Sequence, residues 1–193
     1  MNNKIVKLLL CGILTGLFFS SCEYREYADA DYPDNAIYQP LALDGVLYVD
    51  HAESEDLGLP TPGAPQHYYM DASGDKLYVN LGVVQSGVSL RSCVVEIDVT
   101  YSAINKLIDD GTFDPEIQYL PEAAYTLPDR VTMDGSSAEA AFQLVIDADL
   151  FRSAQYYGKK FAIAVRIHSE DIAVTADLST VVICLDPAFL MEE

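Results

Sequence analysis

The amino-acid sequence predicts an all-β fold, a β-sandwich with one or two short helices. Apolar residues recur at every second position from Ile37 onward, turn residues separate the alternating segments, and no long amphipathic helix interrupts them. About 150 residues are enough to bury roughly 68–70% of the unfolded surface, so a core of this size needs no structural metal ion.

The first 22 residues follow the order of a bacterial lipoprotein signal. Two lysines lie in a polar start, Leu8–Phe19 form an apolar run, and Ser20-Ser21 precede Cys22. The run is shorter than the roughly 20 apolar residues that span a bilayer. We therefore predict a signal peptide over residues 1–21, with lipid attached to Cys22 after cleavage.

The charge balance narrows the class of partner. Lys plus Arg number 11 and Asp plus Glu 30, a formal net charge of −19, so we expect no nucleic acid as a partner. An anionic lipid surface repels such a chain as well, which leaves the lipid on Cys22 as the membrane anchor. The predicted location is the outer membrane, lipid-anchored, at the cell surface, with the periplasmic face as the alternative.

The rest of the chain divides into three predicted parts. Residues 22–35 are polar and acidic and form a tether. The β-sandwich domain spans residues 36–187, and residues 188–193 form a C-terminal tail. Within the domain, alternation of apolar and polar residues predicts strands over four segments: 76–83, 95–100, 139–146 and 161–168.

Turn residues separate these strands. Ser73-Gly74-Asp75 predicts a hairpin between strands that begin at His67 and Lys76. Asp134-Gly135 predicts a second turn, after a strand over Arg130–Met133.

Two short helices are predicted from capping residues. Ser102 is placed to cap a helix over Ala103–Asp109 that stops at Gly111. Asp147 is placed to cap a turn that runs through Phe151 to Ala154.

Two cysteines concern the fold, because Cys11 lies in the signal and Cys22 carries lipid. Cys93 falls on the apolar face of its strand, whereas Cys184 falls on the face opposite the apolar alternation. The opposite parity predicts two buried free thiols; an exported location also permits a disulfide.

No residue pattern indicates catalysis. The sequence lacks GxSxG, GxGxxG, the P-loop and HExxH, and has no Cys/His cluster spaced for zinc. We therefore expect no enzyme activity, no catalytic residue, no cofactor and no metal. Glu96 and Asp98 share a strand face at a separation near that of inverting glycosidases. A solvated outer face also accounts for such a pair in a chain with 30 acidic residues.

Tyrosine is the candidate residue for contacts with sugar, whose apolar faces stack on flat aromatic rings. The chain has 13 Tyr and no Trp, and the candidate ligand-binding residues are the adjacent pairs Tyr68-Tyr69 and Tyr156-Tyr157. A strand places one ring of such a pair outward; alternatively, the rings wedge into the edge of the sandwich. The segment Ala52–Gln66 is rich in Pro and Gly, and is either a plain excursion or a binding loop.

Five segments occur in a characteristic order: VVEIDVTY (Val94–Tyr101), YLPEAAYTLPDRVTMDGSS (Tyr119–Ser137), AAFQLVIDADLF (Ala140–Phe151), KKFAIAVRIHS (Lys159–Ser169) and VVICLD (Val181–Asp186). In these segments the chain resembles the domain of unknown function 1735 family, the N-terminal module of Bacteroides-type surface lipoproteins and endo-β-N-acetylglucosaminidases. The resemblance implies an immunoglobulin-like β-sandwich, exported and often tied to glycan capture, with no established catalytic residues. Members commonly carry a second domain; the sequence ends at Glu193, and we expect neither that domain nor its activity.

Two functions from different classes fit these observations. The first is a non-enzymatic cell-surface lipoprotein that binds or presents glycan as an accessory of a polysaccharide-uptake system. Its partners would be an outer-membrane importer or a surface enzyme. The second is a structural or protein–protein adaptor or spacer, including pilin-like assembly by strand addition, with no glycan ligand.

Overall fold

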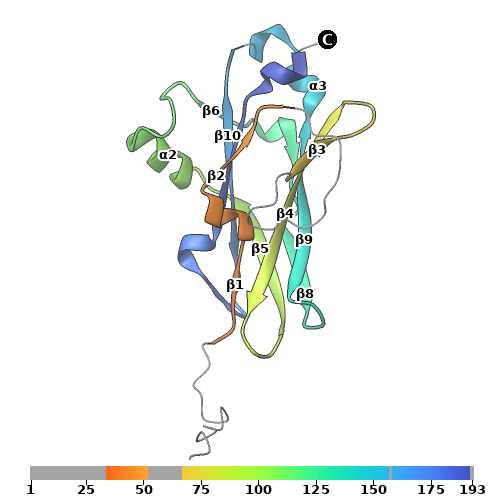
Figure 1. Cartoon of the computed structure of the whole chain (residues 1–193), viewed down its shortest axis with the longest axis vertical. Coiled ribbons are helices and arrows are strands. Elements are labelled where there is room, and N and C mark those ends of the chain that lie inside the picture. Colours follow the sequence, from red (N-terminus) through yellow and green to blue (C-terminus); the bar gives the residue numbers. More distant parts are fainter. Residues whose placement is uncertain (1–33, 52–66, 157, 192–193) are drawn as a thin grey trace, which may run out of the picture. The chain divides into compact units, whose positions relative to one another are not determined.

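The computed structural model of the chain describes residues 34–51, 67–156 and 158–191. Their strands form two sheets that pack as a β-sandwich (Figure 1), which confirms the predicted fold class. The first sheet has the order β11 (Ala173–Val174), β1 (Ala36–Tyr38), β4 (Lys76–Ser86), β9 (Glu139–Asp147), β7 (Tyr125–Thr126), with β3 (Tyr68–Met70) paired to β4. The second has the order β2 (Val46–Val49), β12 (Thr180–Leu185), β10 (Phe161–His168), β5 (Ser92–Val99), β8 (Arg130–Asp134), with β6 (Gln118–Tyr119) paired to β10.

The main core lies between the sheets and is built from the alternating positions of the long strands. β4 and β9 pair antiparallel from Lys76 opposite Asp147 to Val84 opposite Glu139. This register places the inward residues of both strands in one layer, opposite those of β5 and β10. The fully buried members include Leu77, Val79, Val83, Leu144, Ile146, Val95 and Val165, each 0% exposed.

A second, smaller core covers the outer face of the second sheet. Helix α2 (Ser102–Asp109) places Ile104 against β10 and β12, where it packs with Phe113 and with the small residues Ala162 and Ala164. Alanine on the outer face of β10 leaves room for the helix to approach the sheet. β10 is therefore apolar on both faces over much of its length.

The helix ends differ in part from the predictions. Ser102 does not cap α2: the helix begins at Ser102, its N-cap is Tyr101, and the Tyr101 side chain makes no cap hydrogen bond. The Ser102 hydroxyl instead lies 2.9 Å from Oγ1 of Thr100, in the local side-chain bonding that serine favours. The predicted stop at Gly111 fits, because α2 ends at Asp109 and Gly111 has a φ of +79°.

Asp147 is the N-cap of helix α3 (Ala148–Phe151) as predicted, but its carboxylate makes no cap hydrogen bond. It accepts a hydrogen bond from Nζ of Lys76 at 2.9 Å. The chain then continues into the 3-10 helix η4 (Ala154–Tyr156). The other 3-10 helices are η2 (Pro40–Asp44), η3 (Glu122–Ala124), η5 (Ala176–Leu178) and η6 (Pro187–Met191).

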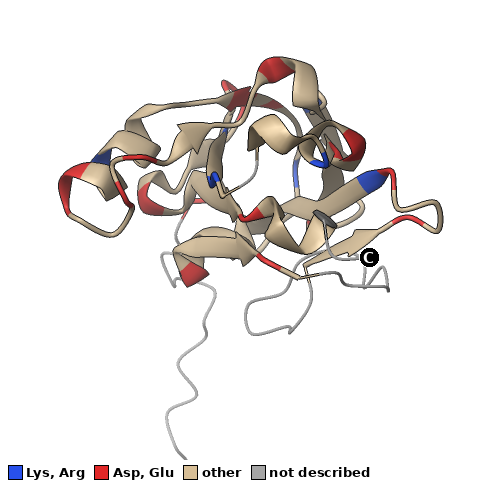
Figure 2. Ribbon diagram, turned by 90° about the horizontal axis from the view of Figure 1, so that it is seen from above, with Lys and Arg blue, Asp and Glu red and all other residues tan. Residues whose placement is uncertain are grey.

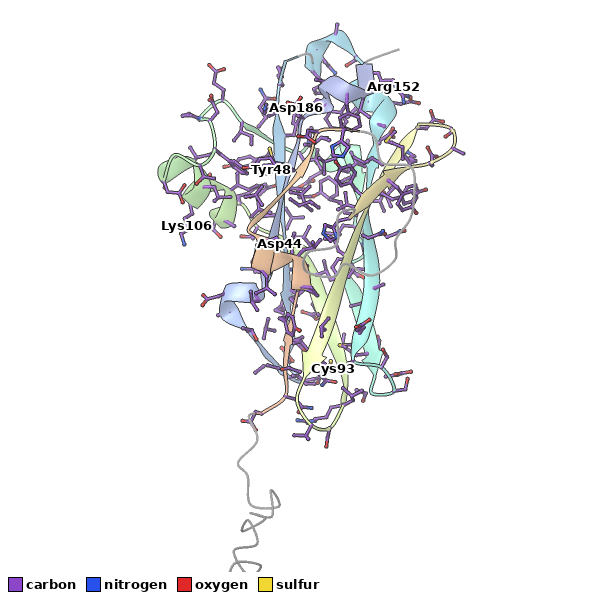
Figure 3. The ribbon with its side chains drawn as sticks, in the orientation of Figure 1. Asp44, Tyr48, Cys93, Lys106, Arg152 and Asp186 are labelled. Atoms are coloured by element: carbon purple, nitrogen blue, oxygen red, sulfur yellow. The ribbon has the colours of Figure 1, made fainter. Side chains whose placement is uncertain are left out.

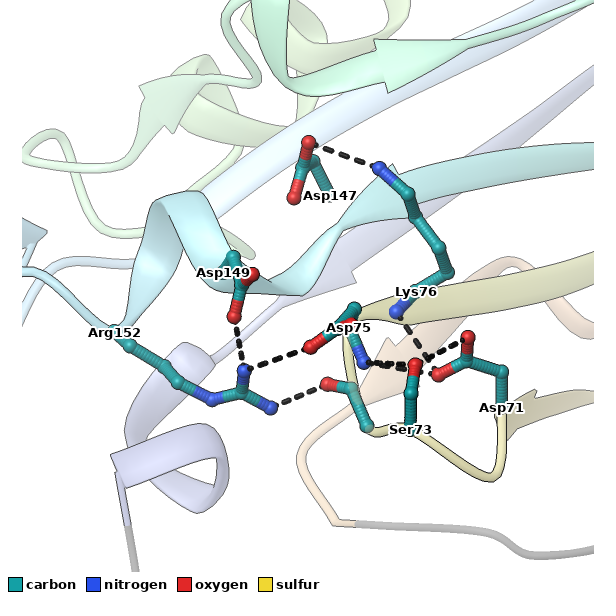
Figure 4. Close-up of polar contacts among 8 residues, drawn as sticks. Asp71, Ser73, Asp75, Lys76, Asp147, Asp149 and Arg152 are labelled. Atoms are coloured by element: carbon teal, nitrogen blue, oxygen red, sulfur yellow. Dashed lines mark hydrogen bonds and ion pairs between the residues drawn. The ribbon is translucent and has the colours of Figure 1, made fainter.

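The predicted β3–β4 hairpin is present and is held from two sides (Figure 4). Oδ1 of Asp71 accepts hydrogen bonds from the backbone N–H groups of Asp75 (2.9 Å) and Lys76 (3.1 Å). The Arg152 guanidinium donates to the Gly74 carbonyl and to Asp149. Gly74 has a φ of +76°, which explains why glycine stands at the tip.

The strands of the domain run from Ala36 to Leu185. The described part of the predicted tail is not detached from the sandwich, since Leu190 is 8% exposed and packs into the main core. The predicted signal peptide with Cys22, most of the tether, and the segment Ala52–Gln66 lie outside the described residues. Within the described ranges, no helix is long and apolar enough to cross a membrane.

Candidate ligand-binding cleft

The first predicted tyrosine pair is split between the two faces of β3. Tyr68 is 4% exposed, and its hydroxyl lies 3.0 Å from Nδ1 of His51, so its ring belongs to the core. Tyr69 points the other way and stacks on Tyr78, with ring centroids 5.0 Å apart and planes 9° apart. Gln143 donates to the Tyr69 hydroxyl over 3.3 Å. Alternation along the strand thus places one ring outward, as expected.

The second predicted pair offers no exposed aromatic platform in the described chain. The Tyr156 ring packs against Phe151 and Phe161, with centroids 5.2 and 5.5 Å away. Tyr157 lies outside the described residues. Tyr68, Tyr69 and Tyr156 therefore do not line one common cleft.

A cleft of about 630 Å³ does open on the outer side of the second sheet. The cleft is lined by Tyr48 of β2, Cys184 of β12, residues 112–114 and 116–118 after α2, and residues 158–160 before β10. β2 and β12 pair in parallel with Tyr48 opposite Cys184, so both side chains lie on the sheet face that carries α2. Tyr48 lies in β2 on that side of the sandwich (Figures 1 and 3) and is 51% exposed.

The segment after α2 is fixed in place as one wall of the cleft. Phe113 is 4% exposed in the smaller core, and its N–H donates to the carbonyl of Leu107 at 2.8 Å. Oδ1 of Asp114 accepts from the N–H of Glu116 at 2.8 Å, which closes a turn. The buried ring thus anchors a short loop that carries Thr112, Asp114, Glu116 and Gln118 into the cleft lining.

The opposite wall carries an ion pair and a neutral thiol. Nζ of Lys160 lies 3.1 Å from Oδ2 of Asp186, and this hydrogen bond raises the pKa of Lys160 above its ordinary value. Burial raises the pKa of Cys184 to about 11. The thiol is therefore protonated at neutral pH and is a poor nucleophile. Cys93 is also a buried free thiol, so both cysteines of the described residues are buried and free, as predicted.

The cleft combines one exposed aromatic ring with side chains that donate and accept hydrogen bonds. A ligand of mixed apolar and hydroxyl character matches such a lining. Acidic side chains occur on loops around the molecule, and basic ones are sparse (Figure 2). Two of the 11 basic residues of the chain, Lys159 and Lys160, line the cleft.

An exposed aromatic pair lies beside α2. Tyr101 and Tyr119 are 43% and 44% exposed, with ring centroids 4.6 Å apart and planes tilted by 50°. The Tyr119 hydroxyl donates to Oδ1 of Asn105 at 2.6 Å. No local pattern in the sequence singles out this pair or Tyr48. A parallel partner strand far away in sequence decides which way Tyr48 points, and alternation within β2 does not reveal that partner.

Glu96 and Asp98 each contact a side chain of the neighbouring strand β10. Glu96 lies 2.5 Å from Nε2 of His168, and Asp98 accepts from Nε of Arg166 at 3.0 Å. Both pairs follow the antiparallel register of β5 and β10. In the part of the chain that the structure describes, no cluster of three His, Cys, Asp or Glu residues could hold a metal ion.

Comparison with known proteins shows the fold and little more. No family model matches the sequence. No curated protein matches it. Among solved structures, a two-domain protein of unknown function from Bacteroides fragilis NCTC 9343 has a TM-score of 0.53 at 9% identity over 79% of this chain and 45% of its own.

Two further solved structures share the fold. A proposed carbohydrate-binding protein from Bacteroides ovatus ATCC 8483 has a TM-score of 0.52 at 10% identity, over 78% of this chain and 36% of its own. EndoBT-3987 of Bacteroides thetaiotamicron, solved with its Man5GlcNAc product, has a TM-score of 0.51 at 12% identity, over 78% of this chain and 30% of its own. This chain thus spans less than half the length of each of the three proteins. These comparisons show a shared β-sandwich fold.

Proposed function

We propose that this chain is a non-enzymatic, lipid-anchored surface protein of the domain of unknown function 1735 family. It binds glycan as an accessory of a polysaccharide-uptake system. The observation that carries the proposal is the cleft on the second sheet, where the exposed ring of Tyr48 stands beside hydrogen-bonding side chains. The five sequence segments that resemble the family support the family assignment.

Binding would follow from two contacts with one sugar ring. The apolar face of a pyranose stacks on Tyr48, and its hydroxyl groups exchange hydrogen bonds with side chains such as Gln118 and Lys159. An open, polar cleft buries little apolar area, so we expect dissociation constants on the order of micromolar to millimolar.

The chemistry of the cleft favours binding over catalysis. Its thiol is neutral at physiological pH, and Lys160 is held by Asp186. The Asp114 carboxylate is occupied by the N–H of Glu116. Two structurally similar proteins are described in connection with carbohydrate, one as a proposed binding protein and one with a bound glycan product. These descriptions concern those proteins and support sugar as the ligand class to test first.

The lipid anchor and the outer-membrane location are inferred from the sequence alone. Lipid on Cys22 would place the protein in the outer membrane, facing the cell surface. Mass spectrometry of the native protein should find an acylated Cys22 at the N-terminus, and the Cys22→Ser variant should stay uncleaved or soluble. An unacylated N-terminus that begins after residue 22 would contradict the lipid anchor.

A glycan array tests the binding function. The expected result is selective, weak retention of one class among host and plant glycans. If no glycan on the array binds and a partner protein co-purifies, the adaptor or spacer function would be favoured instead.

A further inference from the structure

The β4–β5 loop exposes two aliphatic side chains to solvent. Residues 86–92 read SGVSLRS and are all exposed, with no carboxylate and one cation, Arg91. Two aliphatic side chains stand in the loop, Val88 at 66% exposed and Leu90 at 37% exposed. Val88 and Leu90 are two of the seven large hydrophobic side chains that are exposed in the described residues.

The loop has a defined shape rather than an open excursion. Gly87 allows the reversal with a φ of +115°. The N–H of Arg91 donates to Oε1 of Gln85, which is 3% exposed, over 3.1 Å. These contacts hold the base of the loop against the sheet, so Val88 and Leu90 project from a fixed support.

The loop also lies at the end of the sandwich where the described chain begins (Figure 1). Nδ2 of Asn35 donates to the carbonyl of Ser89, which places the two segments in contact. Only the residues between Cys22 and Asn35 separate the predicted lipid from this contact. Even fully extended, such a stretch spans at most roughly 45 Å.

We propose that the β4–β5 loop is a second membrane contact, in which Val88 and Leu90 enter the interfacial layer of a lipid surface and Arg91 meets a headgroup phosphate. The inference rests on the proposed lipid anchor. It would hold the sandwich with this end toward the membrane and leave the Tyr48 cleft on the side of the domain.

The short stretch between the predicted lipid on Cys22 and Asn35 favours lipid over a protein partner for this loop. Phosphate groups repel carboxylates, and the loop itself carries none, while Asp134 lies opposite Ser92 at its base. Arg91 adds a donor suited to phosphate oxygens. Two aliphatic side chains are too few to bind a membrane from free solution, but a covalent anchor raises the effective concentration of the loop at the surface.

Because the chain has no Trp, one introduced indole reports on one position. We would compare Val88→Trp with Leu43→Trp, a matched control at 56% exposure in η2, midway along the sandwich (Figure 1). Residues 22–193, which include every strand of the fold, would be coupled through Cys22 to a maleimide lipid in phosphatidylcholine vesicles. Cys93 and Cys184 are buried and should not react.

Lipids brominated on the acyl chains should quench the fluorescence of the Val88→Trp protein at least about twofold more than that of the Leu43→Trp protein. Adding Leu90→Asp to Val88→Trp should abolish the difference. Equal quenching of the two tryptophan variants would overturn the proposal. A loop that contacts a protein and not lipid would give this result. Chemical coupling supplies the anchor here, so this result is independent of whether cells acylate Cys22 and of whether the cleft binds glycan.

Discussion

Asp98 and Arg166 face each other across β5 and β10, with Nε of Arg166 3.0 Å from Oδ1 of Asp98. The guanidinium lowers the pKa of the Asp98 carboxyl, chiefly through this hydrogen bond. A carboxylate held in this way is committed to a cation on an outer sheet face. The pair therefore accounts for Asp98 at this position through a cross-strand contact.

The first prediction concerns the titration of this pair. Carbon-detected NMR should place the Asp98 midpoint below 3.8, and Arg166→Met should move it up toward 3.8. Since the folded-state pKa is lowered, the pair stabilises the fold above the unfolded pKa, and that contribution is lost as the pH falls through the folded-state value. Both side chains are partly exposed, so Arg166→Met should lower the free energy of unfolding by less than about 1 kcal/mol. An unchanged Asp98 midpoint in the variant would refute the assignment.

The second prediction concerns the thiol in the cleft wall. The Cys184 pKa of about 11 means that its alkylation by iodoacetamide should accelerate roughly tenfold per pH unit from pH 7 to 10. The denatured chain should instead level off near pH 9, the ordinary range of a cysteine. Peptide mass spectrometry of Cys184 under native and denaturing conditions measures both curves. Rapid native labelling at pH 7 would show that the thiol is not buried as described.

The third prediction tests the support of the β3–β4 hairpin. Arg152→Ala removes the hydrogen bond to the Gly74 carbonyl, so the amides of Gly74 and Asp75 should exchange with solvent faster. The free energy of unfolding should fall by less than about 1 kcal/mol, because the contacts of Arg152 lie at the surface. Lys106→Ala, a change on the exposed side of α2, is the control and should leave hairpin exchange unaltered.

The fourth prediction concerns the main core. Phe142→Ala and Val165→Ala should each destabilise the fold by about 2–4 kcal/mol, less for valine, because each removes buried apolar volume. Leu43→Ala, at a side chain that is 56% exposed, should change stability by less than about 0.5 kcal/mol. Urea denaturation followed by circular dichroism measures all three. Equal, small effects would mean that the predicted core positions carry no packing.

Local patterns in the sequence were sufficient for most of the fold. Alternation places Leu77 and Val79 inward, since successive side chains of a strand point to opposite faces. The same argument separates Cys93, in the main core, from Cys184, in the smaller core under α2. Glycine at position 111 marks a helix end because its φ is positive.

The candidate site could not be predicted in the same way. The cleft depends on the parallel pairing of β2 with β12, which brings Tyr48 opposite Cys184 across a long sequence separation. The polar core residue Gln39 illustrates the same point. It is 1% exposed and donates to the carbonyls of Val165 and Ser179 at 2.9 and 2.8 Å, contacts that no local pattern reveals.

The most direct test of the glycan-binding cleft is isothermal titration calorimetry with the glycan that the array selects. The account predicts that Tyr48→Ala weakens binding at least about tenfold, close to 1.4 kcal/mol. It predicts no change for Tyr69→Ala, a ring on the outer face of the other sheet that stacks on Tyr78. Unaltered affinity in Tyr48→Ala, or loss of binding in Tyr69→Ala alone, would contradict it, and so would the absence of any measurable heat.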